Sequence, residues 1–200
     1  DKTGTLTQNE MTVTRIWADD HFIGVTGSGY TPKGDFTNNE KIISLDEYPA
    51  VKTALWIGSL NNDAQLEPSG EQAGQETYRL IGDPTEGSIL VAAHKAGCSA
   101  RAINKGFPRE QEIPFDSTRK RMVTIHSVQE SEGECLSPLD QADEEKREWY
   151  IVTIKGAPDV VLDLCSEMQT INNGNVELTE DRRKQILAAN DAVSYTHLRA

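Results

Sequence analysis

The alternation of apolar and polar positions near the start of the chain predicts a β-hairpin. Met, Val and Ile alternate with Thr and Arg over residues 11–17, and a second apolar run follows at residues 22–25. Such alternation is typical of strands with one buried face, and the Asp19-Asp20 pair between the runs is typical of a turn. The Gly- and Pro-containing stretch 27–34 then predicts a loop.

Further along, apolar positions recur at helical spacing in two places. Residues 49–60 place Ala, Leu and Ile on one side of a predicted helix. A second helix is expected to begin after Asp83, because an Asp cap, a Pro at the first helical position and Glu86 three residues after the cap are start signals. It is expected to end near Gly97, a residue type that often follows a helix.

Two polar stretches interrupt these elements. Residues 67–75, rich in Gly, Glu and Gln, predict a loop ahead of a short strand at residues 77–81. Residues 130–148 hold eight acidic and two basic side chains and separate strands predicted at 122–126 and 149–154. We interpret this second stretch as a solvated hairpin tip. The alternative, a divalent-cation site, would require carboxylates at a fixed spacing.

The last part of the chain predicts two helices around a hairpin. A short helix follows Pro158 and runs to about Met168, the stretch 172–174 (Asn-Asn-Gly) is a hairpin turn signal, and Thr179 caps a helix through about Val193. Together these elements favour an α+β fold, in which a twisted, mainly antiparallel sheet is flanked by helices.

Composition narrows the range of partners. The 200 residues carry a formal net charge of −12, which argues against binding to nucleic acid and against adsorption to an anionic membrane surface. No apolar run approaches the ~18 residues that a membrane helix needs, and no signal peptide opens the chain. We therefore expect one soluble, cytosolic domain that is not embedded in a membrane. The three cysteines do not have a metal-ligand spacing.

The first seven residues, Asp-Lys-Thr-Gly-Thr-Leu-Thr, carry the clearest candidate chemistry. A carboxylate such as Asp1 can attack a γ-phosphate if Mg²⁺ and a cation neutralise the approaching charges. Lys2 adds positive charge beside it, Thr3 offers a hydroxyl, and Gly4 permits close approach to the backbone. The alternative is a coincidental turn followed by a strand.

This string resembles the phosphorylation signature of the P-type ATPases, a branch of the haloacid dehalogenase superfamily. The resemblance implies that Asp1 is the phosphoryl acceptor, that Lys2 and Thr3 assist it, and that Asp1 and Thr3 contribute to a Mg²⁺ site. Phosphatases of the superfamily carry a second aspartate two residues after the nucleophile, where this chain has Thr3. A hydroxyl is a poor general base near pH 7, so the aspartyl phosphate would persist, as a pump requires.

Two later segments resemble parts of the nucleotide-binding domain of this family. The segment 83–87 (Asp-Pro-Thr-Glu-Gly) places Glu86 where the family's glutamate accepts a hydrogen bond from the adenine amino group. Glu86 could instead bond to its own helix N-terminus, as in a capping box. Phe115, followed by Lys120, resembles the stretch whose ring stacks on adenine and whose lysine approaches the nucleotide. A lone Phe ahead of a strand is otherwise a core residue.

A third segment, residues 155–159 (Lys-Gly-Ala-Pro-Asp), resembles the Lys-Gly-Ala-Pro-Glu motif at the floor of the ATP pocket. The resemblance implies that Lys155 and Gly156 bring an ammonium group and bare backbone close to the ligand, with Asp159 in place of the commoner glutamate. The alternative is a lysine ahead of a turn. The loop at residues 27–32 resembles one in the type II branch, which includes calcium pumps, and therefore favours calcium among the cations.

The resemblance also implies a domain division. Residues 1–10 would be a remnant of a haloacid dehalogenase-like phosphorylation domain, into which a nucleotide-binding domain, residues 11–193, is inserted. Residues 194–200 fit the family pattern poorly and are set apart as a tail of uncertain origin. Within that tail, Arg199 is a candidate for the family's phosphate-approaching arginine.

The implied function is ATP binding at the cytoplasmic face of a membrane, as one domain of a pump that hydrolyses ATP through an aspartyl phosphate and transports a cation. The partners would be ATP, Mg²⁺ and the pump's membrane, actuator and phosphorylation domains. Apart from residues 1–10, no segment of this chain resembles those other domains, so we expect it to bind ATP without turnover. Two alternatives remain: a soluble haloacid dehalogenase-like phosphohydrolase and a non-catalytic ATP-sensing module.

Overall fold

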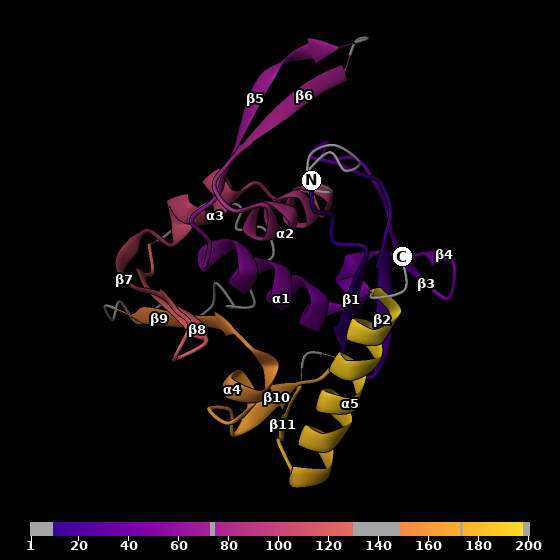
Figure 1. Ribbon diagram of the computed structural model, residues 1–200, viewed down its shortest axis with the longest axis vertical. Coiled ribbons are helices and arrows are strands. Elements are labelled where there is room, and N and C mark those ends of the chain that lie inside the picture. Colours follow the sequence, from indigo (N-terminus) through magenta and orange to yellow (C-terminus); the bar gives the residue numbers. More distant parts are fainter. Residues whose placement is uncertain (1–9, 73–74, 130–148, 173, 198–200) are drawn as a thin grey trace, which may run out of the picture.

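A computed structural model describes residues 10–72, 75–129, 149–172 and 174–197 of the chain, and Figure 1 shows their arrangement. Helices are combined with small antiparallel sheets, which is compatible with an α+β domain. The elements are β1 (Arg15–Ala18), β2 (His21–Val25), β3 (Phe36–Asn38), β4 (Lys41–Ile42), η1 (Leu45–Glu47), α1 (Pro49–Leu60), β5 (Gln65–Gln72), β6 (Gln75–Ile81), α2 (Pro84–Lys95), α3 (Ala100–Gly106), β7 (Arg109–Asp116), β8 (Arg121–Ser127), β9 (Tyr150–Gly156), α4 (Pro158–Leu162), β10 (Glu167–Gln169), β11 (Asn175–Glu177) and α5 (Glu180–His197).

The strands form several small sheets rather than one. Within the described ranges the sheet orders are β1-β2-β3-β4, β5-β6, β7-β8-β9 and β10-β11, and every pairing is antiparallel. The reason is the central helix α1, which contacts both β1 and β9 and therefore packs between two of these sheets (Figure 1). The sequence pattern predicted the strands but did not show how they were grouped.

The β1-β2 hairpin confirms the predicted turn. Asp19 and Asp20 both adopt positive φ angles, 44° and 64°, as the two central residues of a primed hairpin turn require. Strand β1 begins at Arg15 rather than at residue 11, because only from Arg15 onward do the residues pair with β2.

The hydrophobic core surrounds α1, which has the bounds that the sequence predicted. The buried side chains of α1 include Val51, Leu55, Trp56 and Leu60. They pack with buried residues of the N-terminal sheet, of α2 and of α3, and the ring of Phe107 meets Trp56 edge-on at 5.0 Å between centroids. Helix α3 and the short strands β3 and β4 had no counterpart in the sequence-based expectations.

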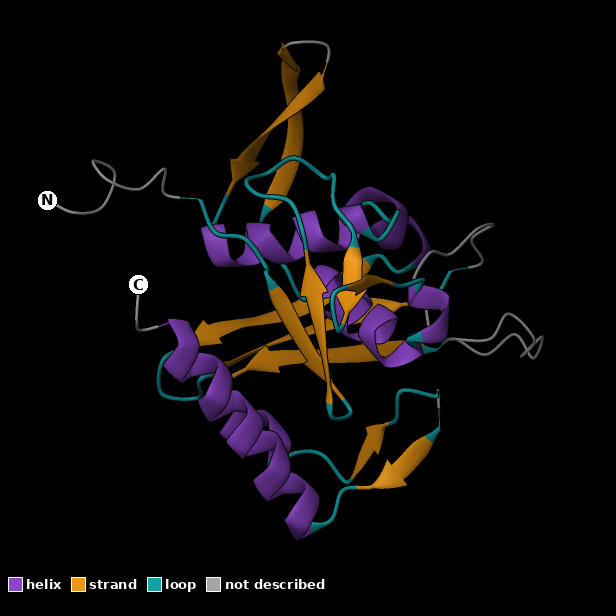
Figure 2. Cartoon of the chain, turned by 90° about the vertical axis from the view of Figure 1, so that its right-hand side faces the viewer, coloured by secondary structure: helices purple, strands orange, loops and turns teal. Residues whose placement is uncertain are grey.

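The predicted loop at residues 67–75 is wrong for most of its length. This stretch lies largely within β5, which pairs with β6 in a hairpin that projects from the body of the molecule (Figures 1 and 2). The register shifts between Pro68, which has no backbone N–H to donate, and Gly70, which adopts a positive φ of 135°. Pairing with β6 supplies the backbone hydrogen bonds, so composition alone was misleading.

The C-terminal part follows the predicted order with different bounds. Helix α4 ends at Leu162, earlier than the predicted end, and β10 occupies residues that were expected to be helical. The predicted hairpin is confirmed by the β10-β11 pairing, and the Thr170 N–H donates to the Gly174 carbonyl at 2.7 Å, while Asn173 of the predicted turn lies outside the described residues. The Thr179 hydroxyl accepts from the Arg182 N–H at 3.3 Å and so caps α5, which continues past Val193 to His197.

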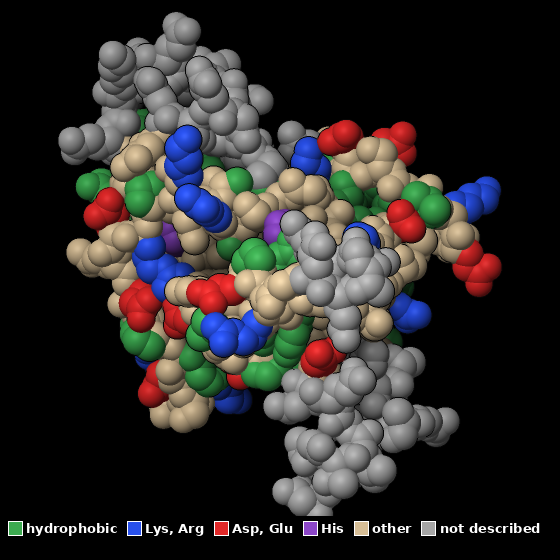
Figure 3. All heavy atoms as spheres, turned by 90° about the horizontal axis from the view of Figure 1, so that it is seen from above, with side chains coloured by type: hydrophobic (Ala, Val, Ile, Leu, Met, Phe, Trp, Pro, Cys, Tyr) green, Lys and Arg blue, Asp and Glu red, His purple; other side chains and the backbone are tan. Residues whose placement is uncertain are grey.

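Charged side chains of both signs are distributed over the surface. The face seen in Figure 3 shows basic, acidic and apolar side chains intermingled, with no single sign dominating its visible part. In the portion of the chain that the structure covers, no helix is both long enough and apolar enough to cross a bilayer.

Candidate functional site

Glu86 lies in the first turn of α2, and its carboxylate does not cap its own helix. That role belongs to Asp83, whose carboxylate accepts from the backbone N–H groups of Thr85 at 2.7 Å and of Glu86 at 3.3 Å. A hydrogen bond from the side-chain hydroxyl of Thr85 is the main reason why the pKa of Asp83 is lowered, and the two backbone N–H groups add to the effect. The side chain of Glu86 is thereby available for contacts with other parts of the fold.

The two oxygens of Glu86 bind groups from different elements. Oε1 accepts from the ammonium group of Lys155 at 2.7 Å, and Oε2 accepts from the backbone N–H of Asp63 at 3.0 Å. The side chains of Glu86 and Lys155 are only 18% and 27% exposed, so the ion pair is largely screened from water. Two residues that the sequence analysis selected independently are therefore in direct contact.

Lys155 lies near the end of β9, at the edge of the sheet where β7 also ends and β8 begins. In the register of the sheet it faces Met122, which is buried, and Gly156 faces Arg121. A Cβ atom added to Gly156 would lie 2.3 Å from the carbonyl oxygen of Lys120. Gly156 is therefore needed for the close approach of β9 to the turn that carries Lys120, and the Ala157 N–H donates to that same carbonyl at 3.0 Å.

Phe115 and Lys120 flank the β7-β8 turn at this same end of the sheet. The ring of Phe115 is 62% exposed, so it is not the core residue that the alternative interpretation required. Lys120 is exposed as well and adopts a positive φ of 52° in the turn. The Asp116 carboxylate stabilises the turn by accepting from the N–H groups of Thr118 and Arg119, both at 2.9 Å.

The segment after α1 connects the helix to Glu86. The side-chain amide of Asn62 donates to the backbone carbonyl of Glu86 at 3.0 Å, while the Asp63 N–H holds the carboxylate of the same residue. The preceding Asn61 is fully buried and donates to the carbonyls of Met122 and Thr153, at 3.2 and 2.9 Å. Consecutive residues thus tie the end of α1 both to α2 and to the β7-β8-β9 sheet.

Arg109, at the start of β7, also binds the segment that follows α1. Its guanidinium donates to the carbonyls of Leu60 at 3.1 Å and Asn62 at 2.5 Å, and to the carboxylates of Asp63 at 2.6 Å and Glu112 at 2.7 Å. Burial alone would lower the pKa of Arg109, but the hydrogen bonds to Asp63 and Glu112 raise it. The guanidinium is therefore permanently charged and fully engaged.

Sequence reasoning missed Asn62, Asp63 and Arg109. The polar run that follows the helix at 49–60 was the only local signal for the first two residues. No local pattern links Arg109 to Asp63, because 46 positions separate them in the chain.

The chemical character of the site is defined by three kinds of group. Glu86 supplies an ionised acceptor, Lys155 and Lys120 supply cations, and Phe115 supplies an exposed aromatic face. These groups suit a purine nucleotide. The ring can stack on the base, the carboxylate can accept from an amino group, and the cations can attract phosphate.

The remaining candidates lie outside the described residues. These are the catalytic and metal-binding candidates Asp1, Lys2 and Thr3, and Arg199 in the tail. Among residues that the structure does describe, no group of three or more His, Cys, Asp or Glu side chains could hold a metal ion.

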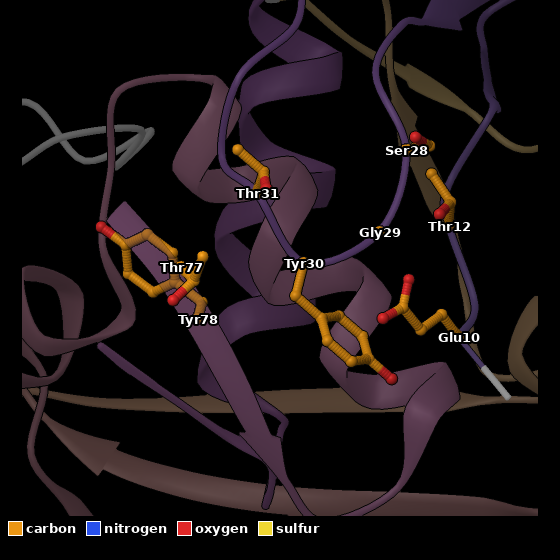
Figure 4. Close-up of a pocket in the computed structure, with 8 residues that line it drawn as sticks. All are labelled: Glu10, Thr12, Ser28, Gly29, Tyr30, Thr31, Thr77 and Tyr78. Atoms are coloured by element: carbon orange, nitrogen blue, oxygen red, sulfur yellow. The ribbon is translucent and has the colours of Figure 1, made fainter. Parts of the chain in front are cut away.

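A separate hollow of about 560 Å³ lies between the loop at residues 28–31 and strand β6 (Figure 4). Glu10 lies beside the ring of Tyr30 in this hollow, and burial, followed by the charge of Glu10, raises the pKa of Tyr30. Its remaining lining consists of Gly29 and side chains that carry hydroxyl groups. Because no lining residue is basic, this hollow offers no cation for a polyphosphate, and it is separate from the Glu86–Lys155 pair. The lining residues are Glu10, Thr12, Ser28, Gly29, Tyr30, Thr31, Thr77 and Tyr78.

Comparison with known proteins gives concordant matches. The family model described as P-type ATPase, cytoplasmic domain N, matches residues 50–200. The chain is 40% identical over 184 residues to a calcium-transporting ATPase of Bacillus subtilis (strain 168), which covers 92% of this chain and 18% of that protein. It is 42% identical over 131 residues to the cation-transporting ATPase pma1 of Synechocystis, covering 63% of this chain and 14% of that protein.

A more distant relative is named for different ions. The sodium/potassium-transporting ATPase subunit alpha of Tetronarce californica is 32% identical over 190 residues, which cover 92% of this chain and 16% of that subunit. The chain thus spans less than a fifth of the length of these relatives.

Proposed function

Since the chain belongs to the family of P-type ATPase cytoplasmic N domains, we propose that it binds ATP at the end of the β7-β8-β9 sheet. The observation that carries the proposal is the contact between Glu86 and Lys155 close to the end of a sheet that also presents Phe115 and Lys120. The residues proposed to bind ATP are Glu86, Phe115, Lys120, Lys155 and Gly156.

In this proposal each residue acts on a different part of the nucleotide. The ring of Phe115 stacks on adenine, and Glu86 accepts a hydrogen bond from the adenine amino group. An ionised carboxylate has lone pairs beyond the two that Lys155 and Asp63 occupy, so it can accept this third bond. Lys155 and Lys120 attract the ribose-phosphate part of the ligand.

Phosphoryl transfer is proposed only for the longer pump. There, residues 11–193 would deliver ATP to Asp1, in the phosphorylation-domain remnant of residues 1–10. A carboxylate oxygen of Asp1 would attack the γ-phosphorus, and the bond to the β–γ bridging oxygen would break and release ADP. Mg²⁺ would bind near Asp1 and Thr3, where it would neutralise phosphate charge, and Lys2 would add to this effect.

The transported ion is proposed to be calcium. The Gly-rich loop at 27–32 and the calcium-transporting relative in Bacillus subtilis favour it. The domain would act at the cytoplasmic face of a membrane, together with the pump's other domains, and would close on them as a rigid body during phosphorylation.

The test is a calorimetric titration of the chain with ATP and GTP. Phe115→Ala is expected to cost ~1–3 kcal/mol of ATP binding free energy, the usual value of base–aromatic stacking. Glu86→Ala and Lys155→Ala are expected to weaken ATP binding as well, and the wild-type chain is expected to prefer ATP to GTP. Phe22→Ala, which removes another exposed ring on β2, is the matched control.

An ATP affinity that is unchanged in all three variants would contradict the proposed pocket. The phosphohydrolase alternative makes a different prediction, namely turnover of an aryl phosphate that Asp1→Asn abolishes. A non-catalytic ATP-sensing module would bind ATP at the same pocket but would not require Asp1 in the longer protein.

A further inference from the structure

Arg109 differs from the proposed ATP ligands because it contacts none of the groups that face the nucleotide. It makes four hydrogen bonds to the segment 60–63 and to Glu112, within 2.5–3.1 Å. Two of the acceptors are carbonyls: that of Leu60, the last residue of α1, where helix carbonyls lack intrahelical partners, and that of Asn62, two residues beyond the helix. One guanidinium thus fixes the direction in which this segment leaves the helix.

The contacts of Arg109 affect Glu86 through one backbone group, the N–H of Asp63. The Asp63 N–H donates to Oε2 of Glu86, and the Asp63 carboxylate is held by Arg109. The position of that N–H therefore depends on the contact of Arg109 with the side chain of the same residue. Without a fixed donor on Oε2, the Glu86 carboxylate would be held only by the flexible side chain of Lys155.

We infer that Arg109 is a positioning residue for base selectivity, which orients the Glu86 carboxylate toward the base through the Asp63 N–H. This inference rests on the proposed ATP site, in which Glu86 accepts from the adenine amino group. Lysine cannot replace arginine in this role, because an ammonium group donates from a single point and cannot span two carbonyls and two carboxylates.

The experiment compares ATP with ITP, which carries a carbonyl in place of the adenine amino group. At position 6 of the base ITP presents an acceptor instead of the amino donor of ATP, so the ratio of the two affinities measures how well the Glu86 carboxylate is placed to accept from that amino group. Arg109→Lys is expected to weaken ATP binding about three- to tenfold, as for loss of one ordinary hydrogen bond, and to leave ITP binding unchanged. Glu86→Ala sets the ratio expected without the carboxylate. Arg79→Lys, in an exposed ion pair with Glu67 on the projecting hairpin, is the matched control.

The outcomes separate this inference from the proposed function. A wild-type chain that does not bind ATP, or that binds ATP and ITP equally, overturns the ATP site and the role of Arg109 with it. A ratio that falls in Glu86→Ala but not in Arg109→Lys overturns only the role of Arg109. Equal losses for ATP and ITP in Arg109→Lys, with a lowered melting temperature, would indicate a general structural role and overturn the inference as well.

A second variant covers the case in which Arg109→Lys does not fold. Asp63→Asn keeps the backbone N–H but removes the carboxylate that anchors it to Arg109. It is expected to lower the ATP-to-ITP ratio in the same direction. An unchanged ratio in this variant contradicts the inference.

Discussion

His126 in β8 is fully buried, and both of its ring nitrogens have partners. Nδ1 lies 2.9 Å from the Phe107 carbonyl, which can only accept, so Nδ1 carries the proton. Nε2 then accepts from the Thr124 hydroxyl at 2.8 Å, and the Thr124 oxygen in turn accepts from the Thr153 hydroxyl at 2.7 Å. With the imidazole neutral, every donor in this chain of hydrogen bonds has an acceptor.

Stability is therefore expected to depend on pH through His126. Burial lowers the pKa of His126, although the hydrogen bond to Phe107 acts in the opposite direction. The unfolded chain takes up a proton near the ordinary histidine pKa of about 6.5, at a pH where the folded ring stays neutral. The free energy of unfolding should thus be level above about pH 6.5 and should decrease as the pH falls below it.

Urea unfolding at a series of pH values measures how steeply the free energy of unfolding falls below about pH 6.5. His126→Gln is expected to reduce this slope, whatever that variant does to stability at neutral pH. His21→Gln serves as the control for loss of a histidine from the half-buried surface. Equal slopes in the wild-type chain and in His126→Gln would show that this prediction is wrong.

At the level of the elements, α5 is attached to the body by charge more than by apolar burial. None of its residues 180–192 is fully buried. Arg182 forms ion pairs with Asp19 and Asp20 of the β1-β2 turn, and Asp19 also accepts from the Ile171 N–H at 2.8 Å. Arg183 donates to carbonyls at the end of α4.

Arg182→Gln is expected to loosen α5, because it leaves the largely buried Asp19 carboxylate without its cation. Hydrogen–deuterium exchange should show a local opening free energy lower by about 1.5–3 kcal/mol for residues 180–192, the usual value of hydrogen bonds to charged groups. Lys184→Gln removes an exposed ion pair with Asp181 on the same helix and is the control. Unaltered exchange in Arg182→Gln would mean that the half-buried apolar residues hold α5 by themselves.

At the level of the whole molecule, the candidate site is assembled from distant parts of the chain. The end of α1, the start of α2 and three strands all contribute, and 69 positions separate Glu86 from Lys155. A ligand that binds only this assembled state stabilises the fold in proportion to the logarithm of its concentration. ATP is therefore expected to raise the melting temperature of the chain, as well as to bind it.

That stabilisation is expected not to require Mg²⁺. The proposed metal ligands, Asp1 and Thr3, lie in the segment proposed to belong to a phosphorylation domain, and the part of the chain that the structure describes contains no cluster of metal-binding side chains. Titration with ATP in EDTA and in excess Mg²⁺ should give the same dissociation constant. A large loss of affinity in EDTA would indicate that the nucleotide-binding residues themselves hold the metal.

The sequence by itself determined the family, the α+β class and most of the residue types at the site. These depend on short-range patterns: a seven-residue string at Asp1, the Asp-Pro start of α2, and alternation along the strands. Asp83 caps its helix through neighbouring N–H groups, so no distant part of the chain is needed to predict it.

Only the tertiary structure decided which of these residues meet. It brought Glu86 to Lys155, assigned Gly156 to the close approach of two strands, and revealed Arg109 as the residue that fixes the end of α1. It also turned the polar stretch after Gln65 into a strand, because pairing with β6 satisfies its backbone. The physical reason is the same in each case: such contacts join groups whose separation along the chain leaves no local pattern, so they exist only once the chain has folded.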